Sequence, residues 1–318
     1  MSSLLLLSDQ GEGLSLGYRA SLEDVLVKTY VRNCNDELPV FNKMSSVPNP
    51  FGLLEQFDFI LADSPALGDL SLSCEDKGFK VYGCSPLSTK LLNAEVHERF
   101  LDLVYGKDRS PVGPWYVTTW WTGQSFTPGL LSFVHSRLME GERGPVVGCA
   151  GSVSIPYPLR GEWTDPLIPA LQKDGYVGPL TLQLDQADRV VHLHLGPYYD
   201  LTYAYLEAVK NLNTFLMNVK ELRSVRLRED VIVTVRATCS LTDPVPFKTM
   251  QVEQEAWRHV HLSLRGKFCV SGRGTTISEA RRRVYRTFDN LTLSPEVMYR
   301  NDVGRNSDDL FKRWECAC

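Results

Sequence analysis

The hydrophobic pattern at the start of the chain predicts alternating strands and helices. An aliphatic run at Leu4–Leu7 precedes a polar loop with two glycines over 8–13, and helical periodicity starts at Leu14. This order of strand, glycine turn and helix is typical of an open parallel sheet. Further buried strands are expected at Phe57–Ala62 and Phe79–Tyr82. Since ligands bind beyond the carboxyl ends of parallel strands, the loops after all three strands should share one edge.

The rest of the pattern mixes helical and strand periods. The expected elements are helices over 87–104 and 201–222, a hairpin turning at 122–124, a glycine-rich loop over 142–158, a hairpin over 180–195, strands over 231–238, 259–264 and 268–271, and a hydroxyl-capped helix with Ala280 and Phe288 on one face. The polar segment Lys107–Pro114 is a predicted linker. The pattern indicates an α/β protein, α+β overall, divided into residues 1–106, 107–229 and 230–318.

Composition and charge exclude several classes of protein for this sequence. The 318 residues are 43% hydrophobic and 23% charged, as in ordinary globular chains, and the net charge of −4 argues against nonspecific coating of nucleic acid. No apolar run approaches the roughly 20 residues of a membrane helix, so we expect no membrane partner and a cytoplasmic location, the host cytoplasm for a viral protein. The eight cysteines, including the pair Cys316 and Cys318, are expected to be reduced thiols.

Two C-terminal motifs carry a family resemblance. Gly274–Tyr285 has a glycine followed by a helix of the E-A-x-x-x-x-Y type, and Tyr299–Arg305 has an R-x-D-x-G segment. Together with Gly175–Leu180 and Gly144–Gly151, this order resembles glycinamide ribonucleotide synthetase of the ATP-grasp superfamily. The resemblance implies a small parallel-sheet N-terminal domain, a reduced ATP-grasp core and a C-terminal β-rich domain.

The departures from that family concern ATP. The family carries an ATP-binding lobe where this chain has only the linker, and its serine–lysine pair before the lobe corresponds to Ala94 and Glu95. Its magnesium-binding glutamate and asparagine correspond to His192 and His194, and neutral imidazole is a poor ligand for magnesium. The resemblance therefore argues against ATP and magnesium, and we expect no cofactor and no bound metal.

His192 and His194 are the candidate catalytic residues. Strand side chains alternate, so both imidazoles should lie on one face of the strand. They are suited to proton transfer, or to a metal site with Asp200 as a third group, and two histidines on a polar strand face remain the alternative.

Three groups of residues are candidates for substrate binding. They are Gly11, Glu12, Asp63 and Ser64 in the edge loops, Gly148, Gly151 and Ser152 in the glycine-rich segment, and Arg300, Asp302 and Arg305 around a turn. Backbone N–H groups of glycine-rich turns hold carboxylates or phosphates, although such turns also serve as plain connections, and the charged trio is also compatible with a surface salt bridge. Cys149 is better explained as a buried thiol than as a nucleophile.

A basic set is the candidate contact for a phosphate backbone. Its members are Lys267, Arg273, Arg281, Arg282, Arg283 and Arg286. Such residues position DNA through its phosphates, although a run of arginines is also a common solvated helix face.

Without ATP, glycine can react through its amine with a substrate that already carries a phosphate leaving group. The chain thus resembles, in its chemical logic, the phage amino acid:DNA transferases, which place glycine on 5-phosphomethyl-deoxyuridine. The expected partners are glycine or another small amino acid and double-stranded DNA whose modified base is flipped into the cleft. The alternatives are an ATP-dependent carboxylate–amine ligase and a noncatalytic binding protein.

Overall fold

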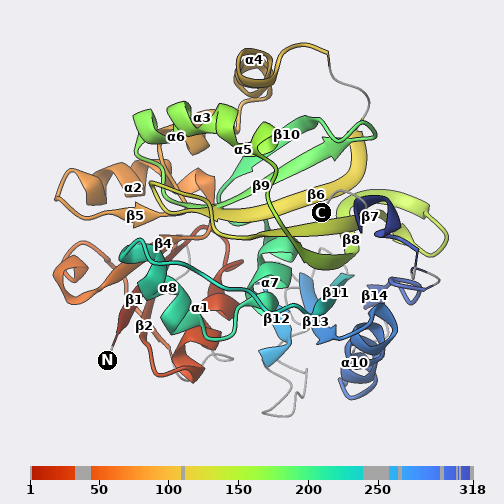
Figure 1. The fold of residues 1–318 in the computed structure, drawn as a ribbon. Coiled ribbons are helices and arrows are strands. Elements are labelled where there is room, and N and C mark those ends of the chain that lie inside the picture. Colours follow the sequence, from red (N-terminus) through yellow and green to blue (C-terminus); the bar gives the residue numbers. More distant parts are fainter. Residues whose placement is uncertain are drawn as a thin grey trace.

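The structure is a computed structural model that describes residues 2–32, 44–108, 112–238, 258–263, 267–293, 297–305, 307 and 309–315. It contains a five-stranded parallel sheet and a larger antiparallel sheet, with helices packed around and between them (Figure 1). The predicted mixed α/β class is confirmed. The Cys316–Cys318 tail lies outside the described residues.

The parallel sheet has the strand order β3-β2-β1-β4-β5. Its strands are β1 (Ser3–Ser8), β2 (Leu26–Val31), β3 (Ser45–Ser46), β4 (Phe59–Ala62) and β5 (Val81–Tyr82). The sequence pattern predicted β1, β4 and β5 but not β2, whose polar Lys28 and Thr29 interrupt the apolar run. Because β1 lies between β2 and β4, the chain order reverses at β1, which is where open sheets bind ligands.

Short helices lie between these strands and after β5. They are α1 (Leu14–Leu22), η1 (Leu54–Gln56), η2 (Pro65–Leu67), α2 (Gly68–Glu75), α3 (Pro86–Lys90) and α4 (Ala94–Tyr105). The single helix predicted over 87–104 is therefore wrong, because the Asn93 side chain accepts hydrogen bonds from the backbone N–H of Glu95 and Val96, both 3.1 Å, and starts a new helix. Residues 106–111 are all that connect α4 to the antiparallel sheet.

The antiparallel sheet has the order β10-β9-β6-β7-β8-β11-β13-β12, with β14 beside β11. Its strands are β6 (Val112–Trp121), β7 (Gly129–Met139), β8 (Arg143–Tyr157), β9 (Gly178–Asp185), β10 (Val190–Leu195), β11 (Val231–Thr238), β12 (Val260–Leu262), β13 (Lys267–Gly274) and β14 (Met298–Tyr299). Strands on both sides of residue 230 share this sheet, and the division into three domains stays a prediction.

The glycine-rich segment predicted as a loop over 142–158 is instead the long strand β8. It pairs with β7 on one side and with β11 on the other, so neighbouring strands satisfy its backbone groups. At Gly151 the lack of a side chain has a packing reason, because a Cβ atom there would lie 2.6 Å from Val303 Cγ2. The local glycine content indicated a loop, and pairing with distant strands overrode it.

Helix α7 (Tyr199–Ala208) lies in the middle of the molecule, between the two sheets (Figure 1). All ten of its residues are buried, and it packs against β6, β8, β11 and β13. The predicted helix over 201–222 is two helices, because the chain leaves the helical conformation at Val209 and Asn211 caps α8 (Leu212–Lys220). The prediction of one continuous helix is therefore wrong.

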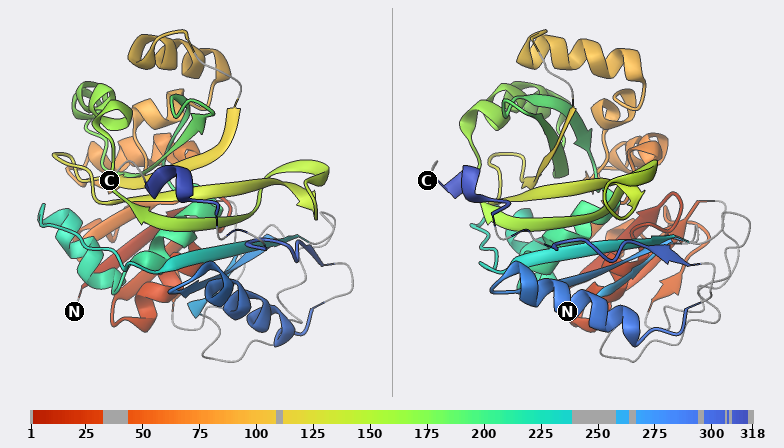
Figure 2. Two further views of the ribbon diagram at one scale, coloured as in Figure 1. Left: turned by 45° about the vertical axis from the view of Figure 1, so that its right-hand side comes forward. Right: turned by 90° about the vertical axis from the view of Figure 1, so that its right-hand side faces the viewer.

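The remaining helices lie at the periphery. They are α5 (Gly161–Thr164), η3 (Asp165–Leu167), α6 (Ile168–Asp174), α10 (Ile277–Asp289) and α11 (Lys312–Glu315). Figure 2 shows α10 on the outer face of the strands that follow residue 230. The predicted hydroxyl cap of α10 is confirmed, since the Thr276 side chain accepts a hydrogen bond from the Glu279 N–H at 3.1 Å. None of the described helices is long and apolar enough to span a bilayer.

A buried ion pair fixes α7 to the antiparallel sheet. The carboxylate of Asp200 on α7 accepts two hydrogen bonds from Arg236 on β11, one of them from Nε at 2.9 Å. Arg236 also donates to the carbonyl oxygen of Val147 at 3.1 Å. Although burial acts in the opposite direction, the Asp200 carboxylate raises the pKa of Arg236. Arg236 therefore stays charged inside the protein.

We expect Asp200→Asn to lower the free energy of unfolding by about 3–5 kcal/mol, because it leaves the buried Arg236 charge unpaired. Urea denaturation of the two proteins measures the difference. The control is Asp69→Asn, which removes an ion pair with Arg32 at an Asp69 side chain that is 80% exposed, and it should cost about 1 kcal/mol or less. Equal losses in the two variants would show that the Asp200–Arg236 pair does not stabilise the fold.

Candidate functional site

A cleft lies at the carboxyl edge of the parallel sheet, beside the start of α7. Its lining comes from the loop after β1, from the residue after β4, and from the segment that leads from β10 into α7. The lining residues are Leu6, Glu12, Gly13, Leu16, Leu61, Asp63, Pro197, Tyr199, Thr202 and Tyr203. Of the three loops predicted to share one edge, those after β1 and β4 supply Glu12, Gly13 and Asp63 to it, and the loop after β5 supplies no lining residue.

Asp63 fastens the β1 loop to the end of β4. Its carboxylate accepts hydrogen bonds from the Ser8 hydroxyl, from the Asp9 N–H at 3.0 Å and from the Gly13 N–H at 2.7 Å. Burial nevertheless raises the pKa of Asp63 to about 6, against the lowering effect of these hydrogen bonds, and Glu12 adds to the increase. Asp63 therefore changes charge close to neutral pH.

Gly13 allows the loop to approach Asp63 this closely. A Cβ atom at this position would lie 2.6 Å from the Asp63 Cβ and 3.2 Å from Leu6 Cδ1. The backbone of Gly13 has an ordinary right-handed conformation, with φ at −84°. The requirement for glycine is thus purely one of space.

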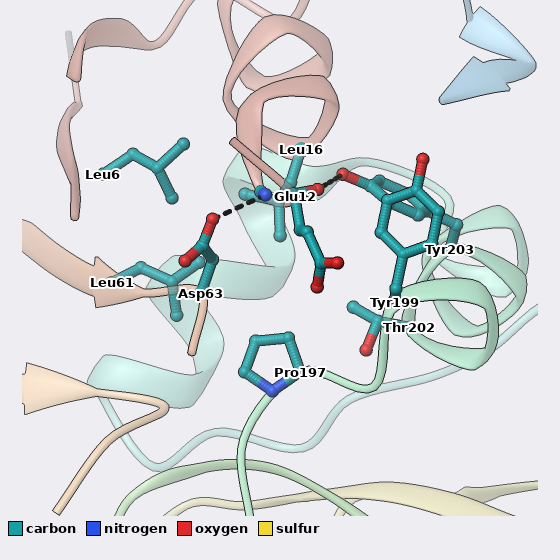
Figure 3. A pocket seen from close by; sticks show the side chains of 10 residues that line it. Leu6, Glu12, Leu16, Leu61, Asp63, Pro197, Tyr199, Thr202 and Tyr203 are labelled. Carbon is teal, nitrogen blue, oxygen red and sulfur yellow. Dashed lines mark hydrogen bonds between the residues drawn. The ribbon is translucent and has the colours of Figure 1, made fainter. Parts of the chain in front are cut away.

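The other wall of the cleft comes from α7 and the loop residue Glu12. The Tyr203 hydroxyl donates to the Glu12 carbonyl oxygen at 2.6 Å, and Figure 3 shows the Glu12 carboxylate pointing into the space beside Pro197 and Thr202. The Thr202 hydroxyl oxygen is buried and has no hydrogen-bond partner among the described residues. Lys267 pairs with the Glu12 carboxylate. The cleft therefore contains the Glu12 carboxylate, paired with Lys267, and the unpartnered Thr202 hydroxyl.

The two hairpin histidines lie on β10 and do not line the cleft, although His194 contacts the lining residue Pro197. The His194 Nε2 donates to the carbonyl oxygen of Pro197 at 3.1 Å, and burial lowers the pKa of His194 while the nearby Glu12 carboxylate opposes the shift. The His192 ring lies 4.4 Å from the ring of His97 on α4. Burial, with help from His97 and His194, lowers the pKa of His192 to about 4. Both histidines are therefore neutral at neutral pH.

Asp200, the third member of the predicted catalytic group, is held by Arg236 and does not line the cleft. Cys149 is fully buried nearby, and burial raises the pKa of its thiol. Gly148 has a φ of +84° at an irregularity of β8, while Gly151 and Ser152 are paired within the sheet. Their predicted roles in catalysis and substrate binding stay predictions.

Arg300, Asp302 and Arg305 form a separate group. Arg300 is buried and donates to both carboxylate oxygens of Asp302 at 2.8 Å, and it also pairs with Glu142 at 2.9 Å. Asp302 accepts a hydrogen bond from the Gly141 N–H at 2.9 Å, and Arg305 contacts Asn301 at 3.4 Å. This group ties the turn between β7 and β8 to the C-terminal segment.

Ser64, another predicted binding residue, caps η2: its side chain accepts a hydrogen bond from the N–H of Ala66 at 3.2 Å.

The predicted DNA-binding residues are divided among several places. Lys267 lies at the cleft, and Arg273 pairs with Glu207 at 3.4 Å and with Asp230 at 3.7 Å. On α10, Arg281 donates to the Asn301 carbonyl oxygen at 2.8 Å and Arg283 pairs with Glu279 at 2.7 Å. The remaining members are exposed on α10, namely Arg282 and Arg286. DNA binding by this set stays a prediction.

Sequence reasoning missed several residues that shape the cleft. Thr202 and Tyr203 lie inside the segment 201–222, which the pattern predicts only as a helix, and Tyr199 lies just before it. A usable signal was the i, i+4 spacing of Tyr199 and Tyr203, which places two hydroxyl groups on one helix face directly after the histidine strand. Which side of α7 faces the cleft depends on packing that the spacing does not reveal.

The fold is that of the ATP-grasp ligases. No protein-family model and no curated protein matches the sequence. Solved structures do match, and the likeness at this level of identity shows the fold.

Phosphoribosylamine–glycine ligase from Thermotoga maritima is 15% identical with a TM-score of 0.65, and the match covers 95% of this chain and 100% of that one. An L-amino acid ligase from Bacillus licheniformis is 12% identical with a TM-score of 0.56, covering 94% and 99%. Phosphoribosylglycinamide synthetase from Anaerococcus prevotii is 8% identical with a TM-score of 0.57, covering 92% and 99%.

The side chains at the hairpin do not fit the magnesium ion that this fold family implies. Magnesium requires oxygen ligands in near-octahedral geometry, and β10 presents imidazoles. In the part of the chain that the structure describes, no group of three or more His, Cys, Asp or Glu side chains is arranged to hold a metal ion. We therefore derive no reaction step that passes through magnesium.

We expect Gly13→Ala to lower the free energy of unfolding by about 1–3 kcal/mol, because the added methyl group overlaps Asp63. The matched control is Gly52→Ala, since a Cβ atom at Gly52 has nothing within 4 Å. Thermal or urea unfolding of both variants measures the difference. If Gly13→Ala is as stable as the control, the close approach of loop and strand is not required.

Proposed function

We propose that the protein is an enzyme that binds the amine of a small amino acid in the cleft and joins this amine to a second substrate. The proposal rests on one observation: Glu12, Asp63 and the unpartnered Thr202 hydroxyl line the same cleft at the carboxyl edge of the parallel sheet. An ammonium group has three donors and a positive charge, so carboxylates and a hydroxyl oxygen are suited to bind it. Glycine is the smallest amino acid and therefore needs the least room in so narrow a cleft.

The amine must lose a proton before it attacks. His194 is suited to accept this proton, because its imidazole is neutral at neutral pH and its Nε2 is fixed on the Pro197 carbonyl at the cleft wall. The bond to Pro197 uses the Nε2 proton, so Nδ1 carries the free lone pair. In this scheme Glu12 orients the ammonium group and His194 removes the proton.

The second substrate separates two candidate reactions. The solved structures with this fold include ligases that act on glycine or L-amino acids, which favours a carboxylate–amine ligation. The imidazoles on β10 and the short connection between α4 and β6 favour the other candidate, an ATP-independent transfer of glycine onto 5-phosphomethyl-deoxyuridine in DNA. In that transfer the amine nitrogen forms a bond to the methylene carbon and phosphate leaves.

An assay with and without ATP decides between these reactions. The protein is incubated with glycine and phosphomethyl-uracil DNA without ATP, and the nucleosides are analysed by mass spectrometry. A glycine adduct with release of one phosphate supports the transfer. ATP hydrolysis that depends on glycine and on an added carboxylate substrate supports the ligation. Failure of glycine to bind at all would overturn both.

We expect Glu12→Gln to weaken glycine binding about 10- to 100-fold, since a hydrogen bond to a charged group contributes about 1.5–3 kcal/mol. Isothermal titration calorimetry measures the affinity. The control is Glu95→Gln, which also removes a carboxylate paired with a basic side chain, here Arg99, but at an exposed site on α4. An equal effect of both changes would place the amine elsewhere.

The pKa of Asp63 predicts a pH dependence for glycine binding. A raised carboxyl pKa of about 6 means that Asp63 is negative above that pH and neutral below it. Ammonium binding should therefore be constant between about pH 7 and 8 and should weaken below pH 6, by at most about tenfold per pH unit. Calorimetric titrations from pH 5 to pH 8 test this, and affinity that rises with acidity would contradict it.

A further inference from the structure

A second, basic cavity lies at the opposite end of α1 and α7 from the cleft. Its lining residues are Arg19, Glu23, Glu207, Lys210, Arg228, Arg258, His259 and Arg273. Ten residues of chain separate Gly13, at the cleft, from Glu23, and a helix rises 1.5 Å per residue, which puts the two ends roughly 15 Å apart. The two sites therefore share the helices but not their lining residues.

Positive charge exceeds negative charge in this cavity. Five lysine and arginine side chains line it, together with the carboxylates of Glu23 and Glu207. Arg19 pairs with Glu23 and donates hydrogen bonds to the carbonyl oxygens of Leu206 and Val209 at the end of α7. In the described chain, no carboxylate pairs with Lys210, Arg228 or Arg258, and Lys210 and Arg258 are exposed at the rim.

Arg228 carries an unsatisfied hydrogen-bond donor in this cavity. Its Nε is buried and has no hydrogen-bond partner among the described residues, and the guanidinium makes only a 3.4 Å contact to the Lys210 carbonyl oxygen. Burial and the neighbouring Arg273 lower the pKa of Arg228. A buried unsatisfied donor on a charged group is costly, and an anion in the cavity would relieve both the lost hydrogen bond and the repulsion.

His259 is oriented toward the same cavity by Glu207. Its Nδ1 lies 3.3 Å from the Glu207 carboxylate, which also accepts from the Ser271 hydroxyl at 3.0 Å and pairs with Arg273 at 3.4 Å. His259 thus uses Nδ1 for Glu207, and its side chain remains 36% exposed. Nε2 is therefore available to a ligand at the cavity mouth.

We propose that this cavity binds a phosphate group, held by Arg228, Arg258 and Lys210 with His259 at its mouth. Arginine forks match phosphate oxygens in pairs, and the excess of cations suits a dianion. The phosphate group belongs either to a small phosphorylated molecule or to a nucleic-acid backbone. The site is independent of amine binding in the cleft, because the two share no lining residue.

The test is calorimetric titration of the full chain with inorganic phosphate and with pyrophosphate at constant ionic strength, so that general screening does not change. Arg228→Gln should weaken binding at least tenfold. The matched control is Arg226→Gln, an exposed arginine two residues away that does not line the cavity, and it should bind as the wild type does. Arg258→Gln, at the exposed rim, gives a second reading if Arg228→Gln does not fold.

Unfolding of the same variants separates a ligand site from a structural role. Without phosphate, Arg228→Gln should be at least as stable as the wild type, because it removes a repelled charge. Phosphate should raise the melting temperature of the wild type but not of this variant. Competition by duplex DNA would assign the phosphate to a nucleic acid, and its absence would assign it to a small molecule. Nonsaturable phosphate binding, or binding unchanged in both Arg228→Gln and Arg258→Gln, would overturn the proposal.

Discussion

Burial of the whole of α7 is the constraint on which the rest of the structure depends. A helix enclosed on every side has to satisfy its own polar groups, and α7 carries the carboxylates of Asp200 and Glu207. Arg236 on β11 neutralises the first, while His259, Ser271 and Arg273 on or beside β12 and β13 surround the second. The antiparallel sheet is thereby fixed to the helix at both ends.

The burial of α7 also fixes the positions of the cleft and the basic cavity. Because α7 begins at the cleft and ends at the basic cavity, the ion pairs that hold the helix also set the positions of Tyr199 and Glu207 relative to α1. Arg19 strengthens this link, since it comes from α1 and binds the last carbonyl oxygens of α7. A change in the packing of α7 would therefore reach both sites together.

The likeness to solved ligases is one of backbone fold. At 15% identity or less among the structures described, the shared feature is the arrangement of the two sheets around the cleft. Within it, this chain places neutral imidazoles on β10 and an aspartate with a raised pKa after β4. Because one fold can carry many reactions, the reaction depends on these titratable groups and not on the fold.

The sequence by itself determined the features that depend on neighbours along the chain. The aliphatic run of β1, the hairpin of β9 and β10 and the Thr276 cap of α10 all follow from local periods and local hydrogen bonds. Only the tertiary structure decided that the 142–158 segment is a strand, that Asp200 forms an ion pair with Arg236, and that Arg228 lines a cavity. The physical reason is distance along the chain: the Asp63–Gly13 contact joins residues 50 positions apart, and no spacing rule encodes such a pair.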